Sequence, residues 1–590
     1  MDSSRRFGNL GCARHRVIGA GIATLICSQL ATGQAVMVGE PGKISKLSHP
    51  ELSTLANGYW FGASVAELGD LGAGGTAIAV GAPQHGNGGD GEVRIVFLDA
   101  TGLVTSSVTI DDGISGFPTG STNSGHFGSA VAYLGSLGPG ALTLHALAIG
   151  DDSDDDGGFQ HGAVHIVFLN PDGTVAPGAV KISDVSGSVM VGLLDDLDNF
   201  GTSLAALGDV DGDGRLDLAV GAIGDDDGFM GQVQAGAVWI LSLEGDGSVQ
   251  VSPKKISNMT EPTLMLGQND VFSEGLAYLG DLGSGAPSLH ALAVGSIFEN
   301  GTMNPGRVHI LFLDNGFSLV GVSVLANNSG GLTAGLLGDG DRFGGSLAAL
   351  GDVDGDGKVD LAVGAEYSDD GGTNAGALWL MSLAPDGTAT SAKKFSALEG
   401  CFAGALEAGD AFGTSVAVAS SLGGSALSHV LVGAILDDDG GTGSMGLAAD
   451  VGAVWLLPLE PCPVASWFNY GSGVPGALGI PALVSLGDPV IGEPVTICCG
   501  SSSGVFASLA WLAIGVSPAS APAFCGTLLV DPLGISFYLA IPSGGAPVEA
   551  TIPCGPALCG AKVYLQTFQQ DVAACKGIAI SRGLQLDLGS

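Results

Sequence analysis

Short apolar segments recur through residues 43–460, and each is bounded by turns rich in Gly and Asp. The segments are too short for ordinary helices and show no helical periodicity, so they predict β-strands. A Phe that is usually followed by Gly opens each of six repeated units, at intervals of 66 to 73 residues: Phe61, Phe127, Phe200, Phe272, Phe343 and Phe412. This internal repetition is the strongest structural signal in the chain.

Each unit contains four predicted strands. The Phe-Gly strand is followed by one that ends in a Gly motif, such as Val80-Gly81-Ala82, and then by a short apolar strand such as Val93 to Leu98. A fourth strand follows, typified by Lys181-Ile182-Ser183. A four-stranded sheet with two apolar faces must stack on its neighbours, and radial stacking gives a β-propeller. The pattern therefore predicts an all-β fold, with a propeller of four-stranded blades over residues 36–461.

The phase of the repeat predicts how the ring closes. Lys43-Ile44-Ser45 has the fourth-strand pattern but follows no unit, while the last unit ends near Leu459 without a fourth strand. We therefore predict that the N-terminal strand lies beside Val454 to Leu459 and completes the last sheet. Six units favour six blades, and a seventh, degenerate unit would give seven.

Residues 1–35 have the pattern of an export signal. Arg5, Arg6, Arg14 and Arg16 precede an apolar run from Val17 to Leu30, and a cut after Ala35 follows small residues. A membrane anchor fits less well because the apolar run is short. The chain is therefore predicted to be secreted or held at the cell surface, with no membrane insertion after the signal is removed.

The charge balance narrows the choice of partners. Lys and Arg total 19 against 59 Asp and Glu, and the formal net charge is −40. Nucleic acids and anionic membranes require a basic surface, so we expect neither as a partner.

Residues 462–590 form a region without the repeat. Strand-like segments include Val495 to Cys498, Ser508 to Ile514 and Ile535 to Ile541. Eight cysteines remain after removal of the signal, and seven of them lie in this region. An even number of cysteines in an exported chain suggests disulfides, so we predict a small disulfide-containing β-sandwich. Its last segment, Gly583 to Leu588, weakly resembles the final strand of accessory domains in secreted bacterial proteins.

One unit carries a recognisable motif in full. Phe200-Gly201-Thr202-Ser203, the acidic turn of residues 208–214, Asp217 to Ala222 and Gly236-Ala237-Val238 resemble an FG-GAP repeat in order and spacing. The resemblance covers residues 43–460 and implies a propeller similar to that at the N-terminus of integrin α-chains. It departs from that family in number, since integrin propellers have seven blades.

Two units contain a complete DxDGDGxxD loop. Alternating carboxylates in a Gly-rich turn converge on one point, and ligand sets of oxygen alone favour Ca²⁺. The alternative is a solvated acidic turn without metal. The resemblance implies that Arg215 and Lys358 contribute main-chain carbonyls. The predicted ligands are Asp209, Asp211, Asp213, Arg215 and Asp217 in one loop, and Asp352, Asp354, Asp356, Lys358 and Asp360 in the other.

Three further features each allow two interpretations. Acidic segments after the second strands, such as Asp151 to Asp156 and Asp225 to Asp227, are either weak cation sites or solvated loops. His145 and His290 either bind a transition metal or hydrogen-bond across a metal-free turn. A bulky position on the third strand either binds ligand or packs one blade against the next: Arg94, His165, Trp239, His309, Trp379 and Trp455. We expect solvated loops, hydrogen-bonded histidines and packing.

The sequence is more consistent with binding than with catalysis. Gly500 to Gly504 matches a GxSxG motif around Ser502, but no His follows it to complete a triad. We therefore predict a calcium-binding interaction or adhesion module for an extracellular protein or glycan. The alternative is an extracellular hydrolase or lyase with its site in the propeller channel. A cluster of His, Asp and Glu in the channel would favour the enzyme.

Overall fold

A computed structural model describes residues 34–37 and 41–588 with short gaps. The gaps up to residue 470 are 73, 85–89, 123–124, 138–143, 187–189, 227–233, 250–251, 284–288, 299–304, 354–355, 400–401, 403, 421, 423–427, 439–449 and 463–465. Beyond residue 470 they are 471, 473, 476, 478–479, 482, 486–488, 491–493, 500–507, 524–525, 531–534, 542–545, 553–560, 572, 575 and 577. Most of the predicted export signal, and the GxSxG motif, therefore lie outside the described residues.

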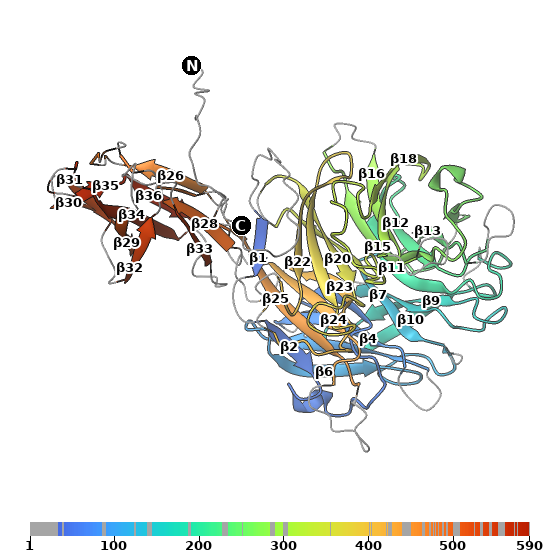
Figure 1. The fold of residues 1–590 in the computed structure, drawn as a ribbon. Coiled ribbons are helices and arrows are strands. Elements are labelled where there is room, and N and C mark those ends of the chain that lie inside the picture. Colours follow the sequence, from blue (N-terminus) through green and yellow to red (C-terminus); the bar gives the residue numbers. More distant parts are fainter. Residues whose placement is uncertain are drawn as a thin grey trace. The chain divides into compact units, whose positions relative to one another are not determined.

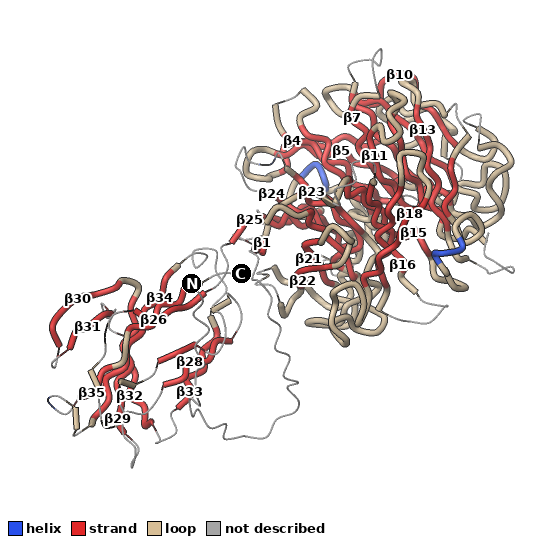
Figure 2. The backbone as a smooth tube through the Cα atoms, turned by 90° about the horizontal axis from the view of Figure 1, so that it is seen from above, coloured by secondary structure: helices blue, strands red, loops and turns tan. Residues whose placement is uncertain are grey.

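The described chain is built from strands in two compact units, one spanning residues 39–460 and the other containing residues 461–590 (Figures 1 and 2). Its helices are two single turns, η1 (Pro50–Leu52) and η2 (Pro262–Leu264), and β1 (Gln34–Met37) is the first strand. No helix among the described residues is long and apolar enough to span a membrane.

Six antiparallel sheets are present in the described part of residues 41–460, and we number them 1 to 6 in chain order. In sheets 1 to 5, four consecutive strands are hydrogen-bonded in sequence order. Sheet 1 is β3 (Ser64–Gly69), β4 (Thr76–Ala82), β5 (Glu92–Leu98) and β6 (Val104–Ile110); sheet 2 is β7 (Phe127–Gly135), β8 (His145–Asp151), β9 (Ala163–Leu169) and β10 (Val175–Ile182); sheet 3 is β11 (Phe200–Gly208), β12 (Leu216–Ala222), β13 (Ala237–Leu243) and β14 (Lys254–Ile256). Sheet 4 is β15 (Phe272–Gly280), β16 (His290–Ser296), β17 (Arg307–Leu313) and β18 (Leu319–Leu325); sheet 5 is β19 (Leu347–Gly351), β20 (Val359–Ala365), β21 (Ala377–Leu383) and β22 (Ala389–Phe395).

Sheet 6 joins the two ends of this unit. It contains β23 (Phe412–Ala419), β24 (Ser428–Ala434) and β25 (Ala453–Cys462), and β2 (Gly42–Ser45) pairs with β25. The register places Lys43 opposite Trp455 and Ile44 opposite Val454. The prediction that the N-terminal strand completes the last sheet is confirmed.

Neighbouring sheets touch at a repeated glycine of the second strand. A Cβ on Gly81 of sheet 1 would overlap the carbonyl oxygen of Gly128 in sheet 2, and each following sheet repeats this contact until Gly433 of sheet 6 meets Gly62 before sheet 1. Only glycine allows so close an approach of two backbones. The first strands β3, β7, β11, β15, β19 and β23 likewise contact one another in a closed cycle. The sheets therefore form a β-propeller, as predicted.

Hydrogen bonds reinforce the same contacts. The Oγ of Ser64 donates to the Gly128 carbonyl at 2.8 Å, and the Oγ of Ser415 donates to the Gly62 carbonyl at 2.7 Å. Second strands such as β4 are buried at every residue, because a neighbouring sheet covers each face. The fourth strand β6 is partly exposed, as expected for an outer edge.

The bulky position of the third strand lies in the core. Trp239, Trp379 and Trp455 are at most 5% exposed, and Trp379 packs edge-on against Phe343, which precedes β19, with ring centroids 6.4 Å apart. The packing interpretation is confirmed for these three tryptophans, whose rings are not available as ligand platforms.

The second unit is also made of strands. One six-stranded sheet, one three-stranded sheet and a hairpin occur in the described residues beyond 465. The strands are β26 (Ser466–Tyr470), β27 (Leu483–Ser485), β28 (Pro494–Cys499), β29 (Ser508–Gly515), β30 (Pro518–Ala523), β31 (Gly526–Val530), β32 (Ile535–Ile541), β33 (Ala546–Thr551), β34 (Lys562–Gln570), β35 (Ile578–Ile580) and β36 (Gly583–Asp587). The strands predicted at 495–498, 508–514 and 535–541 are all present.

The disulfide prediction fails at Cys499. This residue is a free thiol, and burial raises its pKa to about 11. A buried, protonated thiol behaves as a small apolar core group. The side chains of the other predicted disulfide cysteines lie outside the described residues, so disulfides among them stay a prediction.

Candidate functional site

The first acidic loop connects β11 to β12 in sheet 3. Backbone amides hold its carboxylates in place: the N–H of Val210 donates to Asp217 Oδ2 at 2.9 Å, and that of Gly214 donates to Asp209 Oδ2 at 3.0 Å. Gly212 and Gly214 have positive φ angles of 77° and 88°, which allow the chain to curl around the carboxylates.

Three of the predicted ligands converge in this loop. Carboxylate oxygens of Asp209, Asp211 and Asp217 all lie within 4.8 Å of one another. Asp213 is not part of this group, since its Oδ2 accepts a hydrogen bond from Arg215 Nη1 at 2.6 Å. Arg215 also donates through Nε to Glu244 at 2.7 Å. The structure thus brings three of the four predicted carboxylates together.

Asp217 is the buried member of the group. Its side chain is fully buried, and its Oδ1 has no hydrogen-bond partner. Burial, followed by the charges of Asp211, Asp213 and Asp209, raises the pKa of Asp217 to about 6. An unpaired carboxylate oxygen beside two further carboxylates fits a hard divalent cation such as Ca²⁺, which would satisfy that oxygen and offset the repulsion.

The second acidic loop connects β19 to β20 in sheet 5 and repeats the same scaffold. The N–H of Val353 donates to Asp360 Oδ2 at 2.8 Å, and that of Gly357 donates to Asp352 Oδ2 at 3.0 Å. Asp356 pairs with Lys358 Nζ at 2.6 Å. The predicted ligand Asp354 lies outside the described residues.

The two loops differ at the buried aspartate. Asp360 Oδ1 accepts a hydrogen bond of 2.7 Å from Ser382, which lies opposite it on the third strand. Asp217 lies opposite Ser242 in the same register, but neither Asp217 Oδ1 nor Ser242 Oγ has a hydrogen-bond partner. The carbonyl roles of Arg215 and Lys358 stay predictions.

A second charged group lies at the opposite end of the strands, where first strands begin and second strands end. Arg342 precedes Phe343, and its Nη1 donates to Glu366, just after β20, at 2.8 Å. The guanidinium also lies over the ring of Tyr367, 3.9 Å from its centroid. Arg342 has a φ of 58°, and the residue before the repeated Phe also has a positive φ in four other sheets: Trp60, Asn199, Val271 and Ala411.

Sheet 2 carries a charge pair at the same two positions. His126 precedes Phe127, Asp152 follows β8, and His126 Nδ1 lies 2.9 Å from Asp152 Oδ1. The hydrogen bond to Asp152 raises the pKa of His126. Sequence reasoning missed both pairs, although a comparison of the residues flanking the repeat motifs would have revealed charged pairs in two of the six units.

Glu274 of β15 joins this group, which we name the axial cluster: His126, Asp152, Glu274, Arg342 and Glu366. Burial, and after it the charge of Glu366, raises the pKa of Glu274 to about 7, while Arg342 opposes the change. Asp152 of sheet 2 adds to the increase. Charges from sheets 2 and 5 therefore act on one carboxyl group of sheet 4.

The acidic segments after the second strands are not simply solvated. A fourth-strand lysine pairs with one aspartate of the segment in four sheets: Lys181 with Asp154, Lys255 with Asp225, Lys394 with Asp370 and Lys43 with Asp437. Asp154, Asp225 and Asp437 are buried. The solvated-loop interpretation is wrong for these residues, because the lysine brings each carboxylate into the structure as an ion pair.

His145 and His290 have structural partners. The hydroxyl of Tyr133 lies 2.6 Å from His145 Nδ1, and that of Tyr278 lies 2.8 Å from His290 Nδ1. Each pair is also stacked. The hydrogen-bonding interpretation is confirmed.

Comparison with known proteins identifies the repeat. The sequence model of the FG-GAP repeat matches residues 200–241 and 343–381, which contain the two complete acidic loops. No curated protein matches the chain in sequence. Among solved structures, NanB sialidase from Streptococcus pneumoniae is similar with 10% identity and a TM-score of 0.38, over 71% of this chain and 70% of that one. A variant of this sialidase gives 9% identity and a TM-score of 0.35, over 74% and 71%.

Proposed function

We propose that the chain is a secreted or surface-held FG-GAP protein, whose six-bladed, calcium-stabilised propeller binds an extracellular protein or glycan. Its C-terminal unit is an accessory β-sandwich. The proposal that the propeller binds Ca²⁺ rests on the buried Asp217 Oδ1, which has no hydrogen-bond partner and lies beside Asp209 and Asp211. Two such loops would hold two ions on one end of the propeller. The acidic net charge and the repeat architecture support a scaffold for recognition in a calcium-containing environment.

The calcium assignment is tested by thermal unfolding with Ca²⁺ and with a chelator. At a free Ca²⁺ concentration a hundred times the dissociation constant, each site contributes about 2.7 kcal/mol to the free energy of unfolding. We expect Asp217→Asn to lose the contribution of one loop, and Asp217→Asn with Asp360→Asn to lose both. Asp246→Asn, in an exposed turn of the same sheet, is the matched control. Equal melting temperatures of the unmutated protein with Ca²⁺ and with chelator would refute the assignment.

The axial cluster favours a second candidate function, a hydrolase or lyase with its site at the centre of the ring. Glu274, with a pKa of about 7, is poised to give or take a proton near neutral pH, and Glu366 and Arg342 act on it. Such perturbed carboxyl groups are enriched at catalytic sites, but ion-pair networks also produce them.

This candidate is tested by separating binding from turnover. The unmutated protein, Glu274→Gln and Arg342→Ala would be compared on arrays of glycans and extracellular proteins, and each bound glycan would then be assayed for cleavage. An enzyme predicts cleavage that falls at least a hundredfold in Glu274→Gln while binding is retained. Binding that depends on Arg342, without cleavage by the unmutated protein, would support the interaction module and exclude the enzyme.

A further inference from the structure

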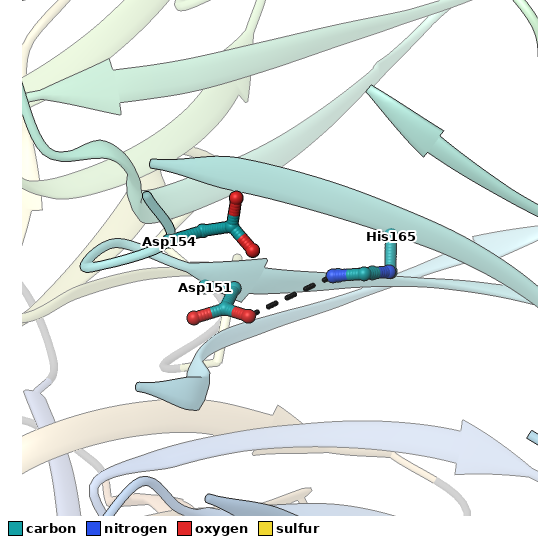
Figure 3. A group of neighbouring side chains, drawn as sticks. All are labelled: Asp151, Asp154 and His165. Carbon is teal, nitrogen blue, oxygen red and sulfur yellow. Dashed lines mark ion pairs between the residues drawn. The ribbon is translucent and has the colours of Figure 1, made fainter. Parts of the chain in front are cut away.

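A buried group in sheet 2 is unlike its equivalents in the other sheets. Asp151 ends β8 and is fully buried, and neither of its carboxylate oxygens has a hydrogen-bond partner. His165 of β9 is 2% exposed, and its Nε2 also has no hydrogen-bond partner. Asp154 lies beside them, and the three side chains face one another (Figure 3).

The repeat shows what normally occupies these positions. In sheet 2 the strand partner of the repeated Phe is Asp151. In sheets 3 and 6 the partner is an alanine, Ala222 or Ala434. Lys181 lies opposite His165, whereas the corresponding lysine lies opposite a tryptophan in sheets 3, 5 and 6. Sheet 2 therefore has a carboxylate and an imidazole that face each other where sheets 3 and 6 have an alanine and a tryptophan.

The distances suit two ligands of one cation better than a direct hydrogen bond. His165 Nε2 and Asp151 Oδ2 are 3.7 Å apart, beyond ordinary hydrogen-bond length. Two ligands that bind a tetrahedral ion at 2.0–2.2 Å lie about 3.3–3.6 Å from each other. Ligand atoms of Asp151, Asp154 and His165 are all within 4.8 Å of one another.

The surroundings hold the three ligands in place. Asp154 Oδ2 accepts a hydrogen bond from Lys181 Nζ at 2.6 Å, and its Oδ1 accepts one from the N–H of Asp156 at 2.9 Å. The His165 ring packs edge-on against Phe117 and Phe127. A Cβ on Gly125 would overlap Asp151 Oδ1, so the lack of a side chain there leaves room for the carboxylate.

We propose that Asp151, Asp154 and His165 form a binding site for a divalent transition-metal ion of the Zn²⁺ class. An imidazole nitrogen with two carboxylate oxygens is a typical zinc donor set, whereas Ca²⁺ takes oxygen ligands alone. The ion satisfies the orphaned atoms of Asp151 and His165, and a fourth position is left for water. This site is independent of the calcium loops, which lie at the other end of the strands.

Zinc binding to the full chain tests the site. Protein stripped with a chelator would be dialysed against Zn²⁺ in excess Ca²⁺, and bound zinc would be measured by mass spectrometry. We expect one equivalent that Asp151→Ala and His165→Trp each lose, with at least a tenfold fall in affinity. Both variants install residues that the equivalent positions of other sheets already carry, so both are expected to fold. With Co²⁺ as the probe, a visible absorption band should appear and vanish in His165→Trp.

Two controls separate this site from other zinc-binding groups. Ser296→Ala changes the equivalent position of sheet 4, and Asp217→Asn changes the calcium loop; both should keep the zinc equivalent. Equal zinc binding by the unmutated protein and Asp151→Ala would overturn the proposal and leave Asp151 and His165 as a buried ion pair without metal.

Discussion

Sheets 2 and 3 share the same four strands and the same register, yet they carry different chemistry at opposite ends. In sheet 3 the carboxylates gather in the turn between the first two strands, and the third strand presents Trp239 beneath Lys255, with Nζ 4.9 Å from the ring centroid. In sheet 2 that turn has no such acidic loop, and the third strand presents His165 beside Asp151. The backbone contacts that close the ring are the same in both. The repeat is thus a fixed scaffold on which a few positions decide where carboxylates gather.

The largest expected loss of stability comes from replacing the fourth-strand lysine, Lys255 in sheet 3 or Lys181 in sheet 2, and Zn²⁺ should affect the two replacements differently. Lys255→Met in sheet 3 leaves Asp225 buried and unneutralised by its lysine, which should lower the free energy of unfolding by about 3 kcal/mol. Lys181→Met in sheet 2 should cost as much in stripped protein but less with Zn²⁺, because the proposed ion also neutralises Asp154. Urea unfolding of both variants, with and without Zn²⁺, measures this. If Zn²⁺ changed the free energy of unfolding of both variants equally, the proposal that sheet 2 alone of these two sheets binds the ion would be contradicted.

A smaller effect concerns the pH dependence of the calcium loop. In protein freed of Ca²⁺ by a chelator, Asp217 has a folded pKa of about 6, above its ordinary value of 3.8. The folded state therefore holds this proton more tightly than the unfolded state, and the resulting contribution to stability is present below pH 4 and is lost as pH rises through 6. Asp217→Asn lacks this titration. In chelator at pH 7 it should therefore be more stable than the unmutated protein by about 1–2 kcal/mol, and in saturating Ca²⁺ it should be less stable.

Urea unfolding at pH 4 and pH 7, in chelator and in saturating Ca²⁺, gives the free energy of unfolding of both proteins under four conditions. The other titrating groups are the same in both proteins, so their contributions cancel in the difference between the two free energies. A variant that is less stable than the unmutated protein under all four conditions would show that Asp217 is not strained by burial and repulsion.

The smallest effect distinguishes the two acidic loops. Ser382→Ala removes a hydrogen bond to the buried Asp360 and should cost about 1 kcal/mol in chelated protein. Ser242→Ala removes a hydroxyl that has no hydrogen-bond partner and should change stability by less than about 0.5 kcal/mol. Thermal unfolding in chelator compares them. Equal losses would mean that Ser242 and Asp217 interact in solution as their equivalents do.

Much of the architecture could be predicted because each blade is encoded locally. The Phe-Gly starts, the Gly of the second strand and the Lys-Ile-Ser strand recur at similar spacing, and the unmatched Lys43-Ile44-Ser45 indicated which strand closes the ring. The acidic loops were also visible, since their ligands lie within nine residues of one another.

The axial cluster and the Asp151 group could not be read in this way. Glu274 and Asp152 belong to different sheets, 122 residues apart in sequence, and only the closed ring lets one charge act on the other. Asp151 stood in an acidic segment that appeared solvated, because burial of a carboxylate depends on what the neighbouring strands place around it.

The sequence by itself determined the strand pattern, the propeller and the position of the acidic loops, because repeated short-range patterns specify strands and turns. The tertiary structure alone decided which carboxylates pair with lysine, which stay without a hydrogen-bond partner beside a potential cation, and which have raised pKa values. The physical reason is that charge energetics depend on burial and on distances between side chains remote in sequence, and folding sets both.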